Sequence, residues 1–273
     1  MSFRPSKNYV ISLRSATERR CHISQEFTQQ GIDFTFFDAV EPPQIAQLAE
    51  KFSMTLSDDI DLTKGEIACL LSHVSLWQKA IDDQLDYIAI FEDDIYLGTD
   101  AKQFLQNDEW IKPDIDVIKL EMFDSYKDMR VFAREDIYNR QLRRLQDIHL
   151  GAAGYILSRK ACQHLVNMIK QAEYIKPSDH IIFEDYLLEN HRVYQMSPAL
   201  CIQSDRLGKT DKIVFQSSLE KNRQQRFEKT ALAIKANLIF KNKMQRELKR
   251  IIYQCTHLFS KIKVLMFCKI NFK

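Results

Sequence analysis

Three adjacent carboxylates, Glu92, Asp93 and Asp94, come directly after the apolar run Tyr87 to Phe91. A continuously apolar run of this length is typical of a central strand covered on both faces. In open α/β sheets, ligands bind in the crevice outside the carboxyl ends of the strands. Packed like charges disfavour one another's ionisation unless a cation compensates them, and carboxylate oxygens suit Mg²⁺ or Mn²⁺. The cluster therefore predicts a metal site that binds substrate phosphates, and the alternative interpretation is a solvated acidic loop.

Further segments alternate between strand and helix patterns and would position this cluster. The capping box Thr63 to Glu66 opens a helix, because the Thr and Glu side chains satisfy backbone N–H groups reciprocally. Strands are predicted at Tyr9–Leu13, Phe34–Phe37, Tyr87–Phe91, Ile115–Leu120 and Tyr155–Leu157, and helices at Ala16–Gln30, from Thr63, and from Ser158 to about Ala172. This alternation predicts an α/β fold with a largely parallel sheet.

Composition excludes several other classes of protein. The chain has 273 residues, of which 45% are hydrophobic and 28% charged, with Gly 6 and Pro 6. These values are ordinary for a globular protein and exclude fibrous, low-complexity and small disulfide-scaffold chains. No C-x-x-C pair, signal peptide or long apolar span is visible, which predicts a protein of the reducing cytoplasm.

The net charge of +2 hides an asymmetry along the chain. From Lys221 to the end there are 14 Lys/Arg and 2 Asp/Glu, whereas the rest carries 25 and 35. We therefore divide the chain into an acidic body, residues 1–216, which is the candidate catalytic domain, and a basic amphipathic helical tail, residues 217–273. Long cationic side chains beside an apolar stripe suit an anionic membrane surface, and the alternative is packing on the domain or on a second copy, as in a homodimer. Nucleic-acid binding is not expected, because the body is acidic and carries no nucleic-acid motif.

Seven segments, in order between Tyr9 and Gln203, resemble glycosyltransferase family 25, the lipooligosaccharide (lipopolysaccharide) galactosyl- and glucosyltransferases of Gram-negative bacteria. They are Val10–Leu13 with Arg19–Arg20, Phe36–Val40, Glu66–His73 with Leu76–Trp77, Ile90–Asp94, Gly151–Ser158, Pro177–Asp179 and Pro198–Gln203. The segment from about Phe123 to Asp147 resembles no family pattern, and we expect it to carry the specificity for the acceptor.

The resemblance implies a GT-A fold, which is a single Rossmann-like mixed sheet flanked by helices. It also implies a UDP-hexose donor (UDP-galactose or UDP-glucose), the divalent metal Mn²⁺, and transfer with inversion to a sugar of the lipooligosaccharide core. The enzyme would then be cytoplasmic and peripheral to the cytoplasmic face of the inner membrane.

The metal and the catalytic base can be assigned to residues within this resemblance. Asp94 is the predicted principal metal ligand, Glu92 and Asp93 lie near the metal or the ribose, and Gln203 completes the metal shell or is a structural amide. Asp179 is the predicted base that takes a proton from the acceptor hydroxyl, and its alternative is a helix N-cap. Glu184, Asp185 and Glu121 are rivals for the base, and Glu121 is also a candidate for binding the acceptor.

The nucleotide-sugar is expected at the ends of the first two strands. The predicted contacts are Ser12, Leu13, Arg20, Asp38, Ala39, Gly65, His73, Glu92 and Asp93. Arg20 would meet a phosphate or pair with a surface carboxylate, and Gly65 would let the backbone approach the donor because it has no Cβ. His73 is either a donor-site residue or a satisfied structural histidine.

Two other functions use the same features differently. A metal-dependent phosphoryl or nucleotidyl transferase would use the same carboxylates on a phosphate. A non-enzymatic peripheral membrane scaffold would use the basic tail alone and leave the acidic cluster solvated.

Overall fold

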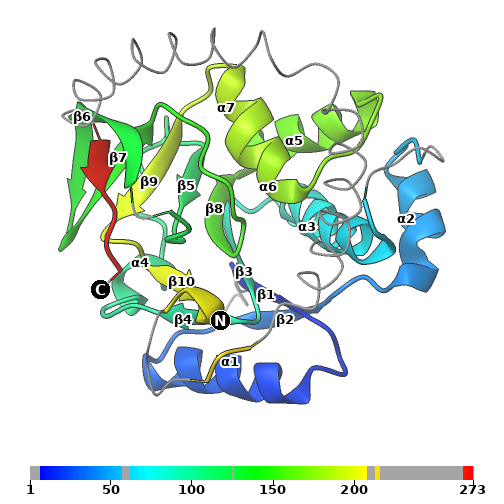
Figure 1. Ribbon diagram of the computed structural model, residues 1–273, viewed down its shortest axis with the longest axis horizontal. Coiled ribbons are helices and arrows are strands. Elements are labelled where there is room, and N and C mark those ends of the chain that lie inside the picture. The colour runs from blue at the N-terminus through cyan, green and yellow to red at the C-terminus, as the bar shows by residue number, and fades with distance from the viewer. Residues whose placement is uncertain (1–6, 57–61, 125, 208–212, 216–266, 273) are drawn as a thin grey trace, which may run out of the picture.

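A nine-stranded mixed sheet forms the centre of the computed structural model, which describes residues 7–56, 62–124, 126–207, 213–215 and 267–272 (Figure 1). The strand order is β11-β6-β7-β9-β5-β8-β3-β1-β2, and β4 pairs separately with β10. The strands are β1 (Asn8–Ser12), β2 (Thr35–Asp38), β3 (Tyr87–Glu92), β4 (Ile95–Leu97), β5 (Val117–Lys119), β6 (Tyr126–Ile137), β7 (Arg140–Leu145), β8 (Gly154–Ser158), β9 (Val193–Ser197), β10 (Cys201–Gln203) and β11 (Phe267–Lys269). The helices are α1 (Thr17–Gln29), α2 (Ile45–Lys51), α3 (Lys64–Asp82), α4 (Lys102–Leu105), α5 (Arg159–Gln171), α6 (Ser178–His180) and α7 (Tyr186–Leu188). A π-helical turn over residues 181–185 joins α6 to α7.

The α/β class is confirmed, but the prediction of a largely parallel sheet is wrong. β1 lies parallel to β2 and β3, and β5 parallel to β9. The pairs β3–β8, β5–β8, β6–β7, β7–β9 and β6–β11 are antiparallel. An apolar run shows that a strand is buried but not which way it runs, so the sequence pattern could not set these directions.

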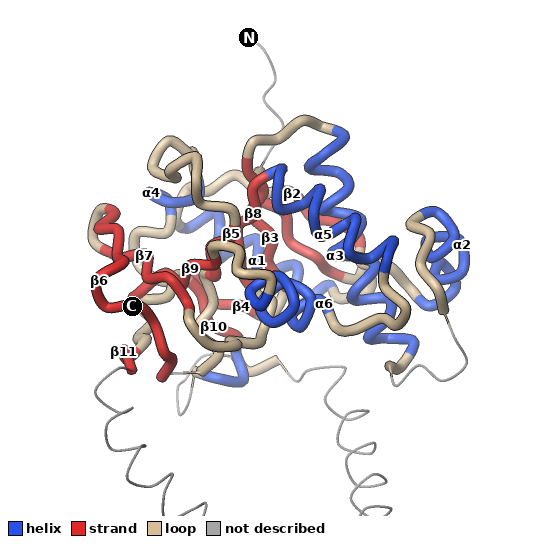
Figure 2. Tube along the Cα trace, turned by 90° about the horizontal axis from the view of Figure 1, so that it is seen from above, coloured by secondary structure: helices blue, strands red, loops and turns tan. Residues whose placement is uncertain are grey.

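Helices cover both faces of the sheet because alternate residues of its strands point to opposite faces. Val10 and Phe91 enter a core with residues of α1 and α4, whereas Tyr9, Ile11 and Ile90 enter a core with residues of α2, α3 and α5. Figure 1 shows α1 on one side of the sheet and α3, α5 and α7 on the other. Figure 2 shows α3 and α5 side by side over their face.

Side-chain caps fix where α3 and α5 begin. Thr63 Oγ1 accepts the Glu66 N–H at 3.2 Å, and Glu66 Oε2 accepts the Thr63 N–H at 2.9 Å, as the capping box predicts. Ser158 Oγ accepts the Ala161 N–H at 3.1 Å and caps α5 as expected. Each such cap contributes about 1 kcal/mol to stability.

Most of the predicted basic tail, residues 216–266, lies outside the described residues. Phe267–Lys269, which the sequence analysis placed in the helical tail, instead form strand β11, which pairs antiparallel with β6, and the side chain of Ile270 is fully buried. The end of the chain therefore lies against the edge of the sheet. Within the described residues, no helix combines the length and the apolar character needed to cross a bilayer.

Candidate active site

A cavity of about 470 Å³ opens at the carboxyl ends of β1, β2 and β3, and we call it the carboxyl-edge cavity. Most of the predicted donor and metal residues line it: Ser12, Leu13, Ala39, Gly65, Glu92, Asp93, Asp94 and Gln203. The parallel register of these strands explains the grouping, since Ser12 pairs with Asp38 and Ile11 with Glu92. The first turn of α3 brings Gly65 to the same place.

A second cavity of about 110 Å³, the Asp179 cavity, adjoins the first. The two cavities share Cys69, Glu92 and Gln203 in their walls. Phe123, Gly151 and Asp179 are among the other residues that line the smaller cavity. A molecule in one cavity would therefore meet a molecule in the other beside Glu92.

The three adjacent carboxylates point to different partners. Asp93 accepts from Ser12 Oγ at 2.7 Å and pairs with Arg19 Nη1 at 2.7 Å. Asp94 and Glu92 face the amide of Gln203, whose Nε2 lies 3.5 Å from Asp94 Oδ1 and 3.4 Å from Glu92 Oε2. Arg19 Nη1 also lies 3.7 Å from Asp94 Oδ2. Burial, with the charge of Glu92, raises the pKa of Asp94 to about 8.

This donor set fits a hard divalent cation. Carboxylate and amide oxygens are the ligands that Mg²⁺ and Mn²⁺ take. The nearby Arg19 guanidinium does not offset the burial and the neighbouring carboxylates that raise the pKa of Asp94. Gln203 reaches Asp94 because β10 pairs antiparallel with β4, with Gln203 opposite Ile95. Turning the Gln203 amide over would present its oxygen in place of its nitrogen.

Arg20 and Asp38 do not line either cavity. Arg20 Nη2 pairs with Asp38 Oδ1 at 2.6 Å and donates to the Ser12 carbonyl at 2.8 Å, which ties the ends of β1 and β2 together. The hydrogen bond from Arg20 to Asp38, with one from Arg14, lowers the pKa of Asp38. The neighbouring Arg19 lines the carboxyl-edge cavity, and our sequence analysis gave it no role. The Arg19–Arg20 pair was visible in the sequence, but only the direction of α1 shows which of the two faces the cavity.

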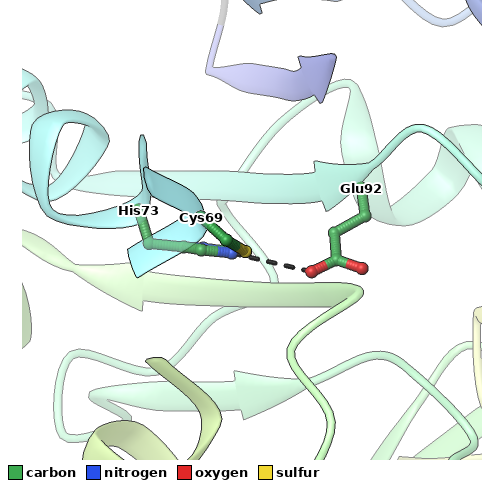
Figure 3. Close-up of side chains that lie close together, drawn as sticks. All are labelled: Cys69, His73 and Glu92. Atoms are coloured by element: carbon green, nitrogen blue, oxygen red, sulfur yellow. Dashed lines mark ion pairs between the residues drawn. The ribbon is translucent and has the colours of Figure 1, made fainter. Parts of the chain in front are cut away.

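His73 lies behind Glu92 and outside the walls of both cavities. Cys69 and His73 are one turn apart on α3 and both point toward Glu92 (Figure 3). Burial lowers the pKa of His73 from 6.5 to about 4, so the ring is neutral. His73 Nε2 lies 3.7 Å from Glu92 Oε1, longer than a hydrogen bond.

The hydrogen bonds of two buried aromatic side chains, Trp77 and Tyr155, indicate which nitrogen of the His73 ring carries its proton. Trp77 Nε1 donates to the Tyr155 hydroxyl at 3.1 Å, and that hydroxyl lies 2.7 Å from His73 Nδ1. If Tyr155 donates to Nδ1, the His73 proton stands on Nε2 and faces Glu92. His73 thus lies behind Glu92 and lines neither of the two cavities.

Asp179 is the one of the four candidate bases that lines the Asp179 cavity. Its Oδ2 accepts the Gly151 N–H at 3.1 Å and its Oδ1 accepts the His180 N–H at 3.0 Å. Pro177, not Asp179, is the N-cap of α6. Glu184 contacts His180 Nδ1 at 2.6 Å, and Asp185 pairs with Lys176 at 2.6 Å.

A buried ion pair supports the loop that holds Asp179. Lys119 and Glu121 have fully buried side chains, 3.3 Å apart, and Lys119 Nζ also donates to the Gly151 carbonyl. Glu121 Oε2 accepts the Ala153 N–H at 3.0 Å. Gly151 has φ +91°, and a Cβ there would lie 2.5 Å from the Phe123 ring, so glycine is required. The acceptor-binding role predicted for Glu121 thus finds no support in its position.

Comparison with known proteins identifies the family. The model of "Glycosyltransferase family 25 (LPS biosynthesis protein)" matches residues 5–182. The chain belongs to glycosyltransferase family 25. It is therefore a glycosyltransferase.

Three bacterial relatives of this family 25 glycosyltransferase cover most of its length. The lipooligosaccharide biosynthesis protein lic2B of Haemophilus influenzae is 40% identical, over 80% of this chain and 83% of its own. The lacto-N-neotetraose biosynthesis glycosyltransferases LgtE and LgtB of Neisseria meningitidis serogroup B are 37% and 34% identical, over 80% and 85% of this chain and 82% and 90% of their own.

Proposed function

We propose that this family 25 enzyme transfers a hexose, with inversion, from a UDP-sugar to a sugar of the lipooligosaccharide core. The observation that carries the proposal is the meeting of two cavities at Glu92 and Gln203. One cavity has oxygen ligands and strand ends suited to a nucleotide diphosphate, and the other holds the carboxylate of Asp179. Two substrates held at one boundary are what group transfer requires.

The nucleotide would occupy the carboxyl-edge cavity. The uracil and ribose would lie against Ser12, Leu13 and Ala39, where the carboxyl ends of β1 and β2 meet. Gly65 would allow close approach of the backbone at the start of α3. Arg19, held beside Asp93 at 2.7 Å, would contribute positive charge to the diphosphate.

Asp94, Glu92 and Gln203 would hold a divalent cation, which we propose to be Mn²⁺. Such an ion supplies charge neutralisation for the departing UDP. His73 would keep Glu92 in place from behind, since its ring is fixed by Tyr155. Asp93 would fix the Arg19 and Ser12 side chains instead of joining the metal shell.

Asp179 would act as the base. The acceptor oxygen forms a bond to the anomeric carbon, the bond from that carbon to the UDP oxygen breaks, and the acceptor proton passes to Asp179. The Gly151 N–H would hold the carboxylate in one orientation. Inversion follows from attack on the face of the sugar opposite the leaving group.

The acceptor would enter from the side of the Asp179 cavity. The names of the relatives concern lipooligosaccharide and lacto-N-neotetraose, which supports an oligosaccharide acceptor. Phe123 lines this cavity, and Arg206 lies 3.6 Å over its ring. Phe123 begins the segment to about Asp147 that resembles no family pattern. We therefore propose that this segment determines the specificity for the acceptor.

Calorimetric titration of UDP, with Mn²⁺ and with EDTA, tests the donor site. We expect metal-dependent binding in the wild type and at least a roughly tenfold loss in Asp94→Asn, because one metal ligand is removed. Asp114→Asn is the matched control, since Asp114 is exposed and pairs with Arg192. Absence of UDP binding in the wild type would overturn the proposal.

Product analysis separates this reaction from the alternative chemistry on the same carboxylates. A glycosyltransferase releases free UDP and lengthens the acceptor by one sugar. A phosphoryl or nucleotidyl transferase leaves phosphate on the product. Detection of a phosphorylated acceptor would contradict sugar transfer.

We further propose that the tail, residues 217–273, binds an anionic membrane surface, which would place the enzyme at the cytoplasmic face of the inner membrane. The support is its charge, with 14 Lys/Arg and 2 Asp/Glu from Lys221 onward. Each Lys or Arg near an anionic leaflet contributes about 1 kcal/mol.

Co-sedimentation with phosphatidylglycerol vesicles tests the tail. The variant K241Q/K243Q/K249Q is expected to bind at least about tenfold more weakly, because three such charges are removed. K102Q/K160Q/K170Q removes as many exposed charges from the domain and should bind as the wild type does. Equal loss in both variants would contradict a role for the tail.

A further inference from the structure

We propose that His164, Glu189 and His191 form a second metal site, selective for Zn²⁺ and similar borderline ions. The ligand atoms of the three side chains all lie within 4.8 Å of one another. His164 Nε2 lies 2.6 Å and His191 Nε2 3.3 Å from the same oxygen, Glu189 Oε2. Two imidazoles from different segments thus converge on one carboxylate oxygen.

The cluster is at the edge of the sheet opposite the candidate active site. β9 runs in the same direction as β3, because both β3 and β5 are antiparallel to β8 and β9 is parallel to β5. His191 comes just before β9, so it lies beyond the amino ends of these strands, whereas Glu92 is at a carboxyl end. His164 is in α5, which begins at the same edge, after β8.

Aromatic packing holds the two rings in place. His191 stacks on Tyr186 with a centroid distance of 4.1 Å and an interplanar angle of 16°. His164 meets His191 edge-on at 4.5 Å and Tyr186 edge-on at 5.3 Å. Tyr186 is buried, so its ring packs against both histidines from a fixed position. Ligands held by packing bind a metal without a large cost of ordering.

The donor types of the cluster suit a divalent cation. Two imidazole nitrogens and one carboxylate oxygen converge on one point, and the carboxylate offsets part of the charge of the ion. His₂Glu with an open fourth position is a ligand set that Zn²⁺ takes, with water as the fourth ligand.

The donor types also separate this site from the oxygen ligands near Asp94. Imidazole nitrogens suit Zn²⁺, Co²⁺, Ni²⁺ and Cu²⁺, whereas carboxylate and amide oxygens suit Mg²⁺ and Mn²⁺. The cluster joins α5 to the segment between α7 and β9, so an ion there would tie these elements together. Its occupancy would raise stability without changing the reaction.

Titration of the full chain, freed of tags and of bound metal, with Co²⁺ tests the site. We expect about one equivalent to give the intense visible absorption of a four-coordinate ion, and Zn²⁺ to remove that absorption by displacement. His164→Gln and His191→Gln should each weaken binding at least about tenfold. Two variants are used because loss of the His191 stacking on Tyr186 could affect folding, whereas His164 is a partly exposed side chain.

Two further variants test whether the Co²⁺ absorption comes from the His164, Glu189 and His191 cluster. His180→Gln removes a histidine that contacts only one carboxylate, Glu184, in the described contacts, and should bind as the wild type does. Asp94→Asn should also keep the Co²⁺ signal, so failure of the proposed donor site and failure of this site are distinguishable. Absence of four-coordinate Co²⁺ in the wild type, or equal binding by His164→Gln, would overturn the proposal.

Discussion

At the carboxyl edge of the sheet Asp94 is 6% exposed and faces Glu92, Arg19 and Gln203, whereas at the opposite edge Glu189 is exposed and meets two histidines. The carboxyl edge carries further buried charges, above all Lys119 and Glu121. Burial makes each of these groups depend on its partner, because an unpaired charge in the interior is costly. Exposed groups can turn to water when a partner is lost.

This difference bears on how the two regions can work. The carboxyl edge keeps its side chains in one arrangement, which group transfer needs, and removal of one residue should disturb several others. The opposite edge stays open to exchange of an ion with solvent. We therefore expect substitutions at the carboxyl edge to have large effects on activity or stability, and substitutions of the exposed cluster to have small effects in the absence of metal.

The largest expected effect is on turnover when Asp179 is replaced. Asp179→Asn should lower kcat by about 10²–10⁴-fold, because it removes the base while the amide oxygen still accepts the Gly151 N–H. Affinity for UDP should stay unchanged, since Asp179 is not in the wall of the carboxyl-edge cavity. Steady-state kinetics and UDP titration measure the two quantities.

Glu184→Gln is the matched control for this substitution. It removes a nearby carboxylate that contacts His180 and lies outside both cavities. Its kcat should stay within about threefold of the wild type. A large loss in Glu184→Gln with little loss in Asp179→Asn would transfer the role of base to Glu184.

The next effect is on stability. Lys119→Met should lower the free energy of unfolding by about 3–5 kcal/mol, because it leaves the carboxylate of Glu121 buried without its cation. K119M/E121Q should recover part of that loss, since a glutamine is neutral and its oxygen can still accept the Ala153 N–H. Urea unfolding of both variants measures the difference.

The double variant decides whether charge is the cause. If K119M/E121Q is as unstable as Lys119→Met, the loss does not come from the charge of Glu121. It then comes from the lost hydrogen bond to the Gly151 carbonyl or from the lost contact of Nζ with the Phe183 ring, at 4.3 Å. The expectation that buried charges at the carboxyl edge depend on their partners more than exposed charges do would then lose its main support. A change below about 1 kcal/mol in Lys119→Met would contradict it directly.

Local patterns in the sequence predicted the elements that stand nearest to the site. The apolar runs predicted β1, β3 and β8, and the capping box predicted the exact residue at which α3 begins. Both signals depend only on residues that are neighbours in the chain. The β6–β7 hairpin was not predicted. Half of its strand residues are charged, among them Arg134, Glu135 and Asp136, because the hairpin lies toward the edge of the sheet, where an apolar run is not needed.

The sequence predicted where the site lies in the sheet better than it predicted which side chains face the cavities. Carboxyl ends of parallel strands meet at one edge, so Ser12, Ala39 and Glu92 could be grouped from strand order alone. Which side chain faces the cavity depends on contacts between distant segments, such as Arg20 with Asp38. The same holds for Glu121, whose burial follows from its contact with the loop at Gly151–Ala153. Spacing along the chain carries no signal for such contacts.

The smallest expected effect is on the rate at which iodoacetamide alkylates Cys69. This measurement tests where the donor binds and needs no substitution. Cys69 lines both cavities, whereas Cys21 is exposed on α1 and lines neither. Burial raises the pKa of the thiols of Cys162 and Cys201, so these two should resist iodoacetamide. UDP with Mn²⁺ at ten times its dissociation constant should slow alkylation of Cys69 about tenfold, because only the unliganded fraction reacts.

Cys21 serves as the internal control in the same sample, and peptide mass spectrometry reads both rates at once. UDP should leave the rate at Cys21 unchanged, because that thiol is exposed on α1 and does not line the carboxyl-edge cavity. Equal slowing at both cysteines would indicate a general effect on the fold instead of occupancy of the cavity. If Cys69 reacts at the same rate with and without bound UDP, the nucleotide does not lie against α3, and the assignment of the carboxyl-edge cavity to the donor is wrong even if UDP binds elsewhere on the chain.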